Sequence, residues 1–195
     1  MTSAGGDHVT VRRVRADEWE LVRSLRREST EDPDASIAFI ETPADVAARS
    51  DEVWQERTRL AAESEGIAQF VAESAGEPVG SLSVLVRATG QTDHMGRFID
   101  DRRADVVGVW VRAESRGAGA VDALLAVAAD WVASLGLRRL QLDVHRDNLR
   151  AQGAYRRAGF APTGETLSGP IGPEIVMARE LPWSDPEANG ASPSR

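Results

Sequence analysis

The sequence predicts an α/β domain built on one mixed sheet, and three observations lead to this prediction. Short alternating or β-branched runs, which are typical of strands, are interspersed with segments whose apolar residues recur at helical spacing. A strand, a glycine turn and a helix follow one another directly between residues 106 and 135. The chain has no internal repeat, and its 195 residues are enough for one domain with a substantial core.

The first half of the chain is predicted to contain one strand, two helices and a strand hairpin. Alternating apolar residues mark the strands, and apolar residues three and four positions apart mark the helices. The predicted elements are a strand at 8–14, a helix capped by Asp17, a proline-broken loop at 28–43, a helix from Ala44 to Glu65, strands at 67–73 and 79–86 joined through 75–78, and a polar loop at 88–103.

The second half alternates strands and helices before a final strand pair. Two glycines, Gly136 and Gly159, stand where helices end in a C-cap glycine. The predicted elements are a strand at 106–111, a glycine turn at 116–120, a helix at 121–135, a strand at 139–144, a helix capped by Asp147 or Asn148, and strands at 160–164 and 175–181 on either side of a Gly/Pro-rich loop at 167–173.

Composition indicates one globular domain without cysteine chemistry. Hydrophobic residues make up 42% of the chain and charged residues 28%, which is ordinary for a globular protein. The chain has no cysteine, so disulfides, thiolate nucleophiles and cysteine metal sites are excluded. We expect residues 1–7 to be a flexible lead-in, residues 8–182 to form the domain, and residues 183–195 to be a disordered tail.

Charge and hydropathy limit the classes of partner. The formal net charge of −8 argues against nucleic acid as a partner. No apolar run approaches membrane-spanning length, and residues 1–6 do not resemble a signal peptide, so we expect a cytoplasmic protein that does not act at a membrane. No histidine or acidic residues have the spacing of a metal site, so no metal is predicted.

The stretch from residue 106 to residue 120 is the main functional signal. A β-branched strand run ends at Arg112, two glycines follow at Gly117 and Gly119, and a helical pattern begins at once. This order directs several backbone N–H groups and the positive end of a helix toward one spot. The pattern therefore predicts an anion site, most simply for a phosphate.

Two familiar phosphate-binding loops do not match this turn. A mononucleotide P-loop ends in Gly-Lys-Ser/Thr, and all 23 basic residues of this chain are arginine. The dinucleotide fingerprint needs a third glycine after G-x-G-x-x, but Gly119 is followed by Ala120, Val121 and Asp122. The anion is therefore held by another kind of turn.

Two motifs remain, and they occur in a fixed order. They are Arg116-Gly117-Ala118-Gly119-Ala120-Val121 and Asn148-x-x-Ala151-x-x-x-Tyr155-x-x-x-Gly159-Phe160. Together they resemble the GNAT superfamily of acetyl-CoA-dependent N-acetyltransferases over residues 9–182, and most closely over 104–160. The resemblance implies a single domain with a mixed, largely antiparallel central sheet flanked by helices, whose two central strands splay apart to admit the coenzyme.

The resemblance also implies a set of acetyl-CoA contacts. The turn from Arg116 to Val121 would hold the coenzyme A pyrophosphate, and the main chain of Val109, Trp110 and Val111 would hold the pantetheine and orient the acetyl carbonyl. Asn148 and Tyr155 would face the pantetheine and the thioester. The turn departs from the family pattern at Val121, where a Gly or Ala is usual, and this departure bears on coenzyme affinity.

Tyr155, the only tyrosine, is the candidate general acid. A phenol with an ordinary pKa of about 10 is protonated at neutral pH and can donate a proton to a departing thiolate. The alternative is a packed core residue with a satisfied hydroxyl group. Asn148 has a similar alternative, because its position also suits a helix cap.

The general base is less well specified by the pattern. Asp105 opens the central strand and is the first choice, while Glu73 and Asp143 are rivals, and each also suits a solvated surface carboxylate. His94 and His145 are able to accept a proton near neutral pH.

The acceptor is specified only as a primary amine, of a small molecule or of a protein N-terminus. Residues 28–65 contain 11 acidic residues and 3 arginines, a local charge of −8 that would attract a cationic amine or simply be a solvated helix face. Two other classes stay open: a non-catalytic acyl-CoA binding or sensing domain, and a plain interaction domain. A homodimer is possible.

Overall fold

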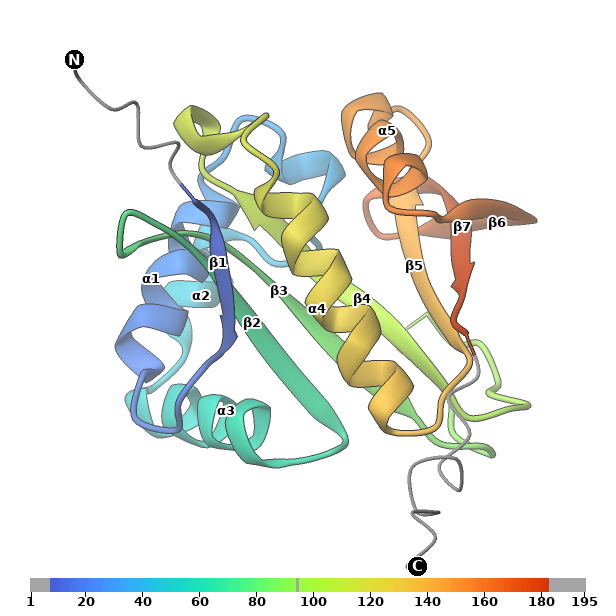
Figure 1. Cartoon of the computed structure of the whole chain (residues 1–195), viewed down its shortest axis with the longest axis horizontal. Coiled ribbons are helices and arrows are strands. Elements are labelled where there is room, and N and C mark those ends of the chain that lie inside the picture. The colour runs from blue at the N-terminus through green and yellow to red at the C-terminus, as the bar shows by residue number, and fades with distance from the viewer. Residues whose placement is uncertain (1–7, 94, 183–195) are drawn as a thin grey trace, which may run out of the picture.

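The central sheet is mixed, and its seven strands follow the order β1-β2-β3-β4-β5-β7-β6 (Figure 1). The computed structural model describes residues 8–93 and 95–182, so the predicted lead-in, the predicted tail and His94 lie outside the described residues. Strands β4 and β5 pair in parallel, and the other neighbouring strands of the described chain pair antiparallel. The predicted α/β fold with a mixed, largely antiparallel sheet flanked by helices is confirmed.

The elements alternate along the chain in the predicted order. The strands are β1 (Thr10–Arg13), β2 (Ile67–Ser74), β3 (Glu77–Arg87), β4 (Arg103–Val111), β5 (Arg139–His145), β6 (Ala161–Gly169) and β7 (Gly172–Glu180). The α-helices are α1 (Trp19–Thr30), α2 (Pro43–Ala48), α3 (Asp51–Glu63), α4 (Ala120–Ser134) and α5 (Leu149–Arg157). Two short 3₁₀ helices cover Ala35–Ile37 and Ala113–Ser115.

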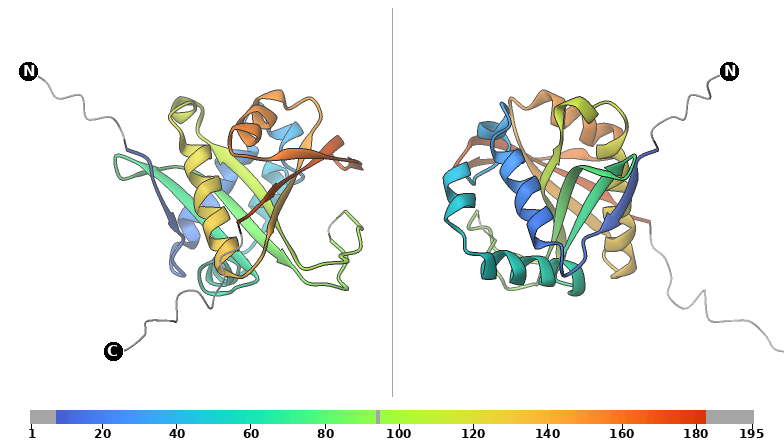
Figure 2. Two further views of the ribbon diagram at one scale, coloured as in Figure 1. Left: turned by 45° about the vertical axis from the view of Figure 1, so that its right-hand side comes forward. Right: turned by 90° about the vertical axis from the view of Figure 1, so that its left-hand side faces the viewer.

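Helices cover both faces of the sheet (Figure 2), and each face has its own apolar core. On one face, Leu124 and Leu125 of α4 pack against strand residues such as Leu82. On the other face, Leu25 of α1 and Trp54 of α3 pack together, and Trp110 of β4 joins them. Because side chains alternate along a strand, β4 supplies both cores, with Val106 in the first and Trp110 in the second, while the apolar residues of β5 join the first core.

Strands β4 and β5 separate soon after they pair. Their register covers only Ala104↔Leu140 and Asp105↔Gln141. Gly108 of β4 has φ +64°, and the β3–β4 register shifts between Ser81 and Ser83, so β4 bulges at this point. The splay of the two central strands that the family resemblance implies is therefore present, and it opens toward α5.

The predicted helix from Ala44 to Glu65 is wrong as one element, because two helices occupy this range. Arg49 has ψ 134° and Ser50 has ψ 162°, so both residues are extended and break the helix. Arg49 in this conformation forms an ion pair with Glu41, and its guanidinium lies over the Trp54 ring. A second helix then begins after Ser50 with two acidic residues in its first turn, a favourable start next to the helix dipole.

Two further local predictions are wrong. Asp17 does not cap α1; its side chain is exposed, and Glu18 occupies the N-cap position while it accepts hydrogen bonds from Arg12. The predicted Gly/Pro-rich loop at 167–173 is instead the end of a β6–β7 hairpin, in which Gly169 pairs with Gly172. Strand β6 lies at the sheet edge, where glycine and proline are tolerated.

The ends of the helices in the second half agree with the predictions. Gly136 and Gly159 have φ of +72° and +87° directly after α4 and α5. Asn148 rather than Asp147 caps α5. No helix of residues 8–93 and 95–182 is both long and apolar enough to cross a membrane.

Candidate active site

A cavity of about 1000 Å³ lies where β4 and β5 separate. One wall is formed by the glycine turn, the start of α4, and α5. Other lining residues come from α1, the segment 32–41, α3, the ends of β4 and β5, and Glu174 of β7. This volume is in the range of small-molecule and cofactor sites. The sequence motifs at 106–121 and 148–155 therefore meet in one cavity with residues that are distant in the chain.

The glycine turn has the geometry of an anion site. Gly117 and Gly119 have φ of +82° and +84°, a region that residues with a Cβ adopt at a cost. Gly119 is the N-cap of α4, so the first N–H groups of this helix are directed toward the cavity wall. A Cβ added at either glycine would meet no atom within 4 Å, so the turn is open to a ligand. These features fit a phosphate group.

Nine of the ten predicted coenzyme residues line the cavity. They are Val109, Trp110, Val111, Arg116, Gly117, Gly119, Ala120, Val121 and Asn148. Ala118, the tenth, lies in the same turn but is not among the lining residues. The side chain of Val121 packs against the core beneath α4, so it also has a structural role.

Arg116 braces the turn through its side chain. Its Nε donates a hydrogen bond to the carbonyl oxygen of Val111 at 3.0 Å, and its Nη2 forms an ion pair with Asp32. The carboxylate of Asp32 also accepts a hydrogen bond from Trp110 Nε1 at 3.0 Å. Asp32 thus holds the end of β4 and the glycine turn together, although it lies 84 residues before Arg116 in the sequence.

The surroundings of Asp32 favour its charged form. Burial acts to raise the pKa of Asp32, but hydrogen bonds from the Asp34 backbone N–H and from Trp110, together with the charge of Arg116, outweigh it. The pKa is held below its ordinary value of 3.8. The brace therefore keeps a carboxylate across the physiological pH range.

Strand β4 presents an open backbone edge to the cavity. Beyond Asp105 it has no strand partner on the β5 side within the described residues. Val109, Trp110 and Val111 lie along this edge and line the cavity. Unpaired strand N–H and C=O groups are ready to hydrogen bond an extended ligand.

Tyr155 and Asn148 belong to the same wall. Tyr155 of α5 is 8% exposed and packs against Phe160, with ring centroids 6.2 Å apart. Burial raises the pKa of Tyr155 to about 12, so its phenol stays protonated at neutral pH. Asn148 Oδ1 accepts a hydrogen bond from the Ala151 N–H at 3.1 Å, which is the predicted capping role. Both side chains line the cavity.

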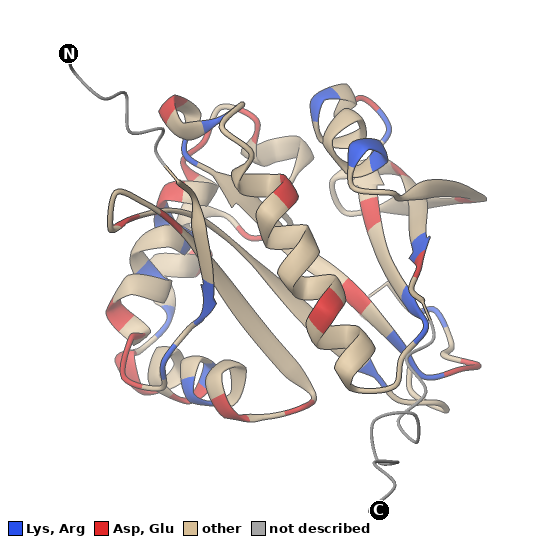
Figure 3. Cartoon of the chain, in the orientation of Figure 1, with Lys and Arg blue, Asp and Glu red and all other residues tan. Residues whose placement is uncertain are grey.

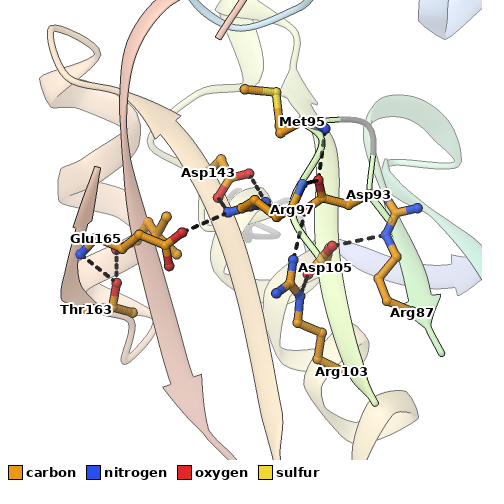
Figure 4. A network of polar contacts seen from close by, with 10 residues as sticks. Arg87, Asp93, Met95, Arg97, Arg103, Asp105, Asp143, Thr163 and Glu165 are labelled. Carbon is orange, nitrogen blue, oxygen red and sulfur yellow. Dashed lines mark hydrogen bonds and ion pairs between the residues drawn. The ribbon is translucent and has the colours of Figure 1, made fainter. Parts of the chain in front are cut away.

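Asp105 lies in the cavity wall but is held by arginines (Figure 4). Its carboxylate accepts hydrogen bonds from Arg87 Nε at 3.1 Å and from Arg103 Nε at 3.0 Å. Arg103 also donates a hydrogen bond to Asp93, whose carboxylate accepts a second hydrogen bond from Arg97 Nε at 2.7 Å. This network fastens the polar loop to β4, and it engages both carboxylate oxygens of Asp105 with arginines.

The other predicted bases are also engaged or remote. Asp143 forms a two-pronged ion pair with Arg97, at 3.1 and 2.6 Å. Glu73 pairs with Arg12 and is not among the residues that line the cavity. His145 lines the cavity, and its Nδ1 accepts a hydrogen bond from the Asp147 N–H at 3.1 Å.

Glu174 is a cavity carboxylate that the sequence analysis missed. It is 7% exposed, lies opposite His145 in the β5–β7 register, and lines the cavity. Its carboxylate accepts no hydrogen bond from the part of the chain that the structure describes. Burial, with the nearby charge of Asp143, raises the pKa of Glu174 above its ordinary value. A carboxylate with these properties is a candidate general base.

Comparison with known proteins agrees with this geometry. The model of the acetyltransferase (GNAT) family matches residues 19–160. The chain belongs to the GNAT acetyltransferase family. No curated protein matches the chain.

Solved structures share the fold at low sequence identity. A GNAT-family acetyltransferase from Streptococcus pneumoniae has a TM-score of 0.69 and 20% identity, covering 90% of this chain and 100% of that one. A phosphinothricin acetyltransferase from Sinorhizobium meliloti in complex with AcCoA has a TM-score of 0.64 and 20% identity, covering 89% and 88%. The spermidine N-acetyltransferase from Vibrio cholerae in complex with CoA and spermine has a TM-score of 0.62 and 19% identity, covering 89% and 95%.

Proposed function

We propose that this protein transfers an acetyl group from acetyl-CoA to a primary amine of a small molecule or protein N-terminus. One observation carries the proposal. A single cavity brings together an anion-binding glycine turn, an open strand edge, a protonated phenol and a carboxylate with a raised pKa. Two structural neighbours support this choice: a spermidine N-acetyltransferase solved with CoA and spermine, and a phosphinothricin acetyltransferase solved with AcCoA.

The coenzyme wall supplies binding and orientation. In the proposal, N–H groups of the turn from Arg116 to Val121 bind the pyrophosphate, which is favoured at a helix N-terminus. The open edge at Val109–Val111 binds the pantetheine and directs the thioester carbonyl, with Asn148 beside it. Fixing the thioester next to the acceptor lowers the entropic part of the barrier.

Three proton transfers complete the proposed reaction. Glu174 removes a proton from the acceptor ammonium, so that the free amine attacks the thioester carbonyl carbon and forms the C–N bond. The C–S bond then breaks as Tyr155 gives its hydroxyl proton to the departing thiolate sulfur, and the acetylated nitrogen loses its extra proton to the Tyr155 phenolate, which leaves a neutral amide and restores the phenol. Asp105, the first choice from the sequence, is the alternative base; Glu174 is preferred because no arginine bonds its carboxylate in the described structure.

Release of free thiol from acetyl-CoA tests the proposed function. The acceptor set would contain amino acids, spermidine, an aminoglycoside and a peptide with a free N-terminus, with coenzyme binding measured separately by calorimetry. We expect coenzyme binding and thiol release that depends on an amine. Binding without amine-dependent release would instead identify an acyl-CoA binding domain, and the lack of both would identify an interaction domain.

Two expectations about the cellular context accompany this proposal. We propose that the protein acts in the cytoplasm, where acetyl-CoA is present, and cell fractionation tests this. A homodimer is the oligomer to look for, and sedimentation of the full chain at several concentrations would detect it.

A further inference from the structure

The part of the cavity lining that comes from α1, α3 and Glu41 contains an excess of positive charge. Glu41 forms ion pairs with both Arg26 and Arg49. Arg57 lies beside this group, since the charges of Glu41, Arg26 and Arg49 all affect the pKa of Arg57. Arg26, Glu41 and Arg57 line the cavity, and the group places three guanidinium groups near one carboxylate, which pairs with two of them. We call Arg26, Arg49, Arg57 and Glu41 the arginine cluster.

Arg57 is the member without an anionic partner. It extends from α3 into the cavity wall, with its guanidinium carbon 5.7 Å from the centroid of the Trp54 ring. It forms no hydrogen bond or ion pair with residues 8–93 or 95–182. Burial lowers the pKa of Arg57, since removal from water disfavours the charged form. A half-buried guanidinium without a partner is costly unless it binds a ligand.

The arginine cluster adjoins the strand edge that would hold the thioester. A Cβ added at Gly108, the bulge residue of β4, would lie 3.6 Å from Arg26 Nη1. Gly108 directly precedes Val109, the first residue of the open edge. A ligand anion bound by the cluster would therefore lie within a few bonds of an amine poised for acetyl transfer.

The acidic stretch at 28–65 does not offset this positive charge. Acidic and basic positions are interleaved along α1 and α3 (Figure 3). Acidic residues of the stretch that face the cavity pair with arginines from elsewhere in the chain. These pairs are Asp32 with Arg116, Asp34 with Arg150, and Glu41 with Arg26. The local negative charge of the sequence favours a cationic amine. These three carboxylates are already paired with arginines, so they are not free to bind it.

We propose that Arg57, with Arg26, binds a carboxylate group of the acceptor, so that the acceptor is an amino acid rather than a polyamine or aminoglycoside. This inference rests on the proposed acetyl transfer. A planar guanidinium binds a carboxylate through two parallel hydrogen bonds, which suits Arg57. The Nε and Nη2 of Arg26 contact Glu41, so Arg26 would add a single contact through its Nη1. The acceptor amine then lies toward Glu174, and its carboxylate lies toward the cluster. The two ends of the acceptor site complement a zwitterion.

Matched acceptors and matched variants test this inference. Thiol release would be measured with α-, β- and γ-amino acids, each beside its own amide, and with spermidine. The amide keeps the amine and the side chain but removes the negative charge. Arg57→Gln removes the cation, Arg57→Lys keeps it, and Arg59→Gln is the control. Arg59 lies on the same helix, but its partners are the exposed Glu56 and Glu63.

We expect the wild-type protein to use an amino acid with a kcat/KM about 10- to 100-fold above that of its amide, the range for a charge-assisted pair. Arg57→Gln should abolish this preference by raising the KM for the amino acid, with the KM for acetyl-CoA unchanged. Arg57→Lys should restore much of the preference, and Arg59→Gln should keep all of it. Thermal denaturation checks that each variant is folded.

Three results would overturn the inference. Equal or better use of amides or spermidine by the wild-type protein would overturn it while leaving acetyl transfer intact. An unchanged preference of Arg57→Gln for the amino acid over its amide would also overturn the inference. So would a loss of this preference in Arg59→Gln as large as the loss in Arg57→Gln. If none of the amines supported thiol release, the proposed function itself would fail, and the same assay would detect this outcome.

Discussion

The two walls of the cavity are built in different ways. The coenzyme wall consists of two continuous segments, 106–121 and 148–160, in which strand, turn and helix follow one another. The acceptor wall takes Arg26 from α1, Glu41 from a loop, Arg57 from α3 and Glu174 from β7. Backbone groups dominate the first wall, and side chains dominate the second. This difference separates what short-range sequence specifies from what only long-range packing brings together.

Replacement of Tyr155 by Phe should have the largest effect on turnover. The ring and most of its packing remain, and no second tyrosine can substitute for the lost hydroxyl. General acid catalysis contributes roughly 10²- to 10⁴-fold, so kcat should fall within that range while coenzyme affinity stays nearly constant. Steady-state kinetics and calorimetry on the same variant test this. Full turnover in a less stable protein would make Tyr155 a core residue.

Replacement of Glu174 by Gln should lower turnover by about 10²-fold, the lower end for a general base. In the wild-type protein, the rate should fall as pH drops through the raised pKa of Glu174, and this limb should be absent from Glu174→Gln. The neighbouring charges Asp143, His145 and Arg97 set that pKa together with burial. Rate profiles against pH measure both effects.

The same variant makes a prediction about stability. Because the folded-state pKa of Glu174 is raised, its contribution to stability is present below about pH 4.5 and is lost as pH rises through the folded pKa. At neutral pH, Glu174→Gln should thus melt at the same temperature as the wild-type protein or higher. Asp105→Asn should melt lower, because Arg87 and Arg103 lose their carboxylate. A turnover loss in Asp105→Asn alone would return the base role to Asp105.

Replacement of Gly119 by Asp should weaken acetyl-CoA binding about 10- to 100-fold, because a carboxylate would stand where N–H groups face the pyrophosphate. The control is Gly76→Asp in the β2–β3 turn. Gly76 has φ +83° against +84° for Gly119, and both are open to an added Cβ, so the backbone strain is matched. Calorimetry should find weakened binding in Gly119→Asp only. Equal affinities in two folded variants would refute the anion site.

Replacement of Asp32 by Asn should have the smallest effect on turnover, and should lower the free energy of unfolding by about 1–3 kcal/mol. Arg116 loses its charge partner, while Trp110 keeps an acceptor oxygen. Since the folded-state pKa of Asp32 is lowered, its contribution is present above about pH 3.8 and is lost as pH falls through the folded pKa. Denaturant titration at pH 7 and pH 3 should therefore find a difference between variant and wild type that shrinks at pH 3.

The sequence alone determined the local structure of the proposed coenzyme wall, because the signals for that structure are local. Positive-φ glycines at Gly117 and Gly119, the helix after them, and the Asn148 cap each depend on residues a few positions away. The same holds for the alternation of β5, which placed Leu142 and Asp143 on opposite faces. Local chemistry misled where other contacts outweighed it, at the cap of α1, at the break near Arg49 and in the β6–β7 hairpin.

The acceptor wall was decided by tertiary structure. Neither Arg57 nor Glu174 has a distinguishing neighbour in the sequence, and an arginine on an acidic helix is ordinarily a solvated residue. Asp105 was a reasonable base until the fold brought Arg87 against it, from a strand 18 residues earlier. Charge compensation acts over a few ångströms in space, so it depends on which strands pair and which helices cover them.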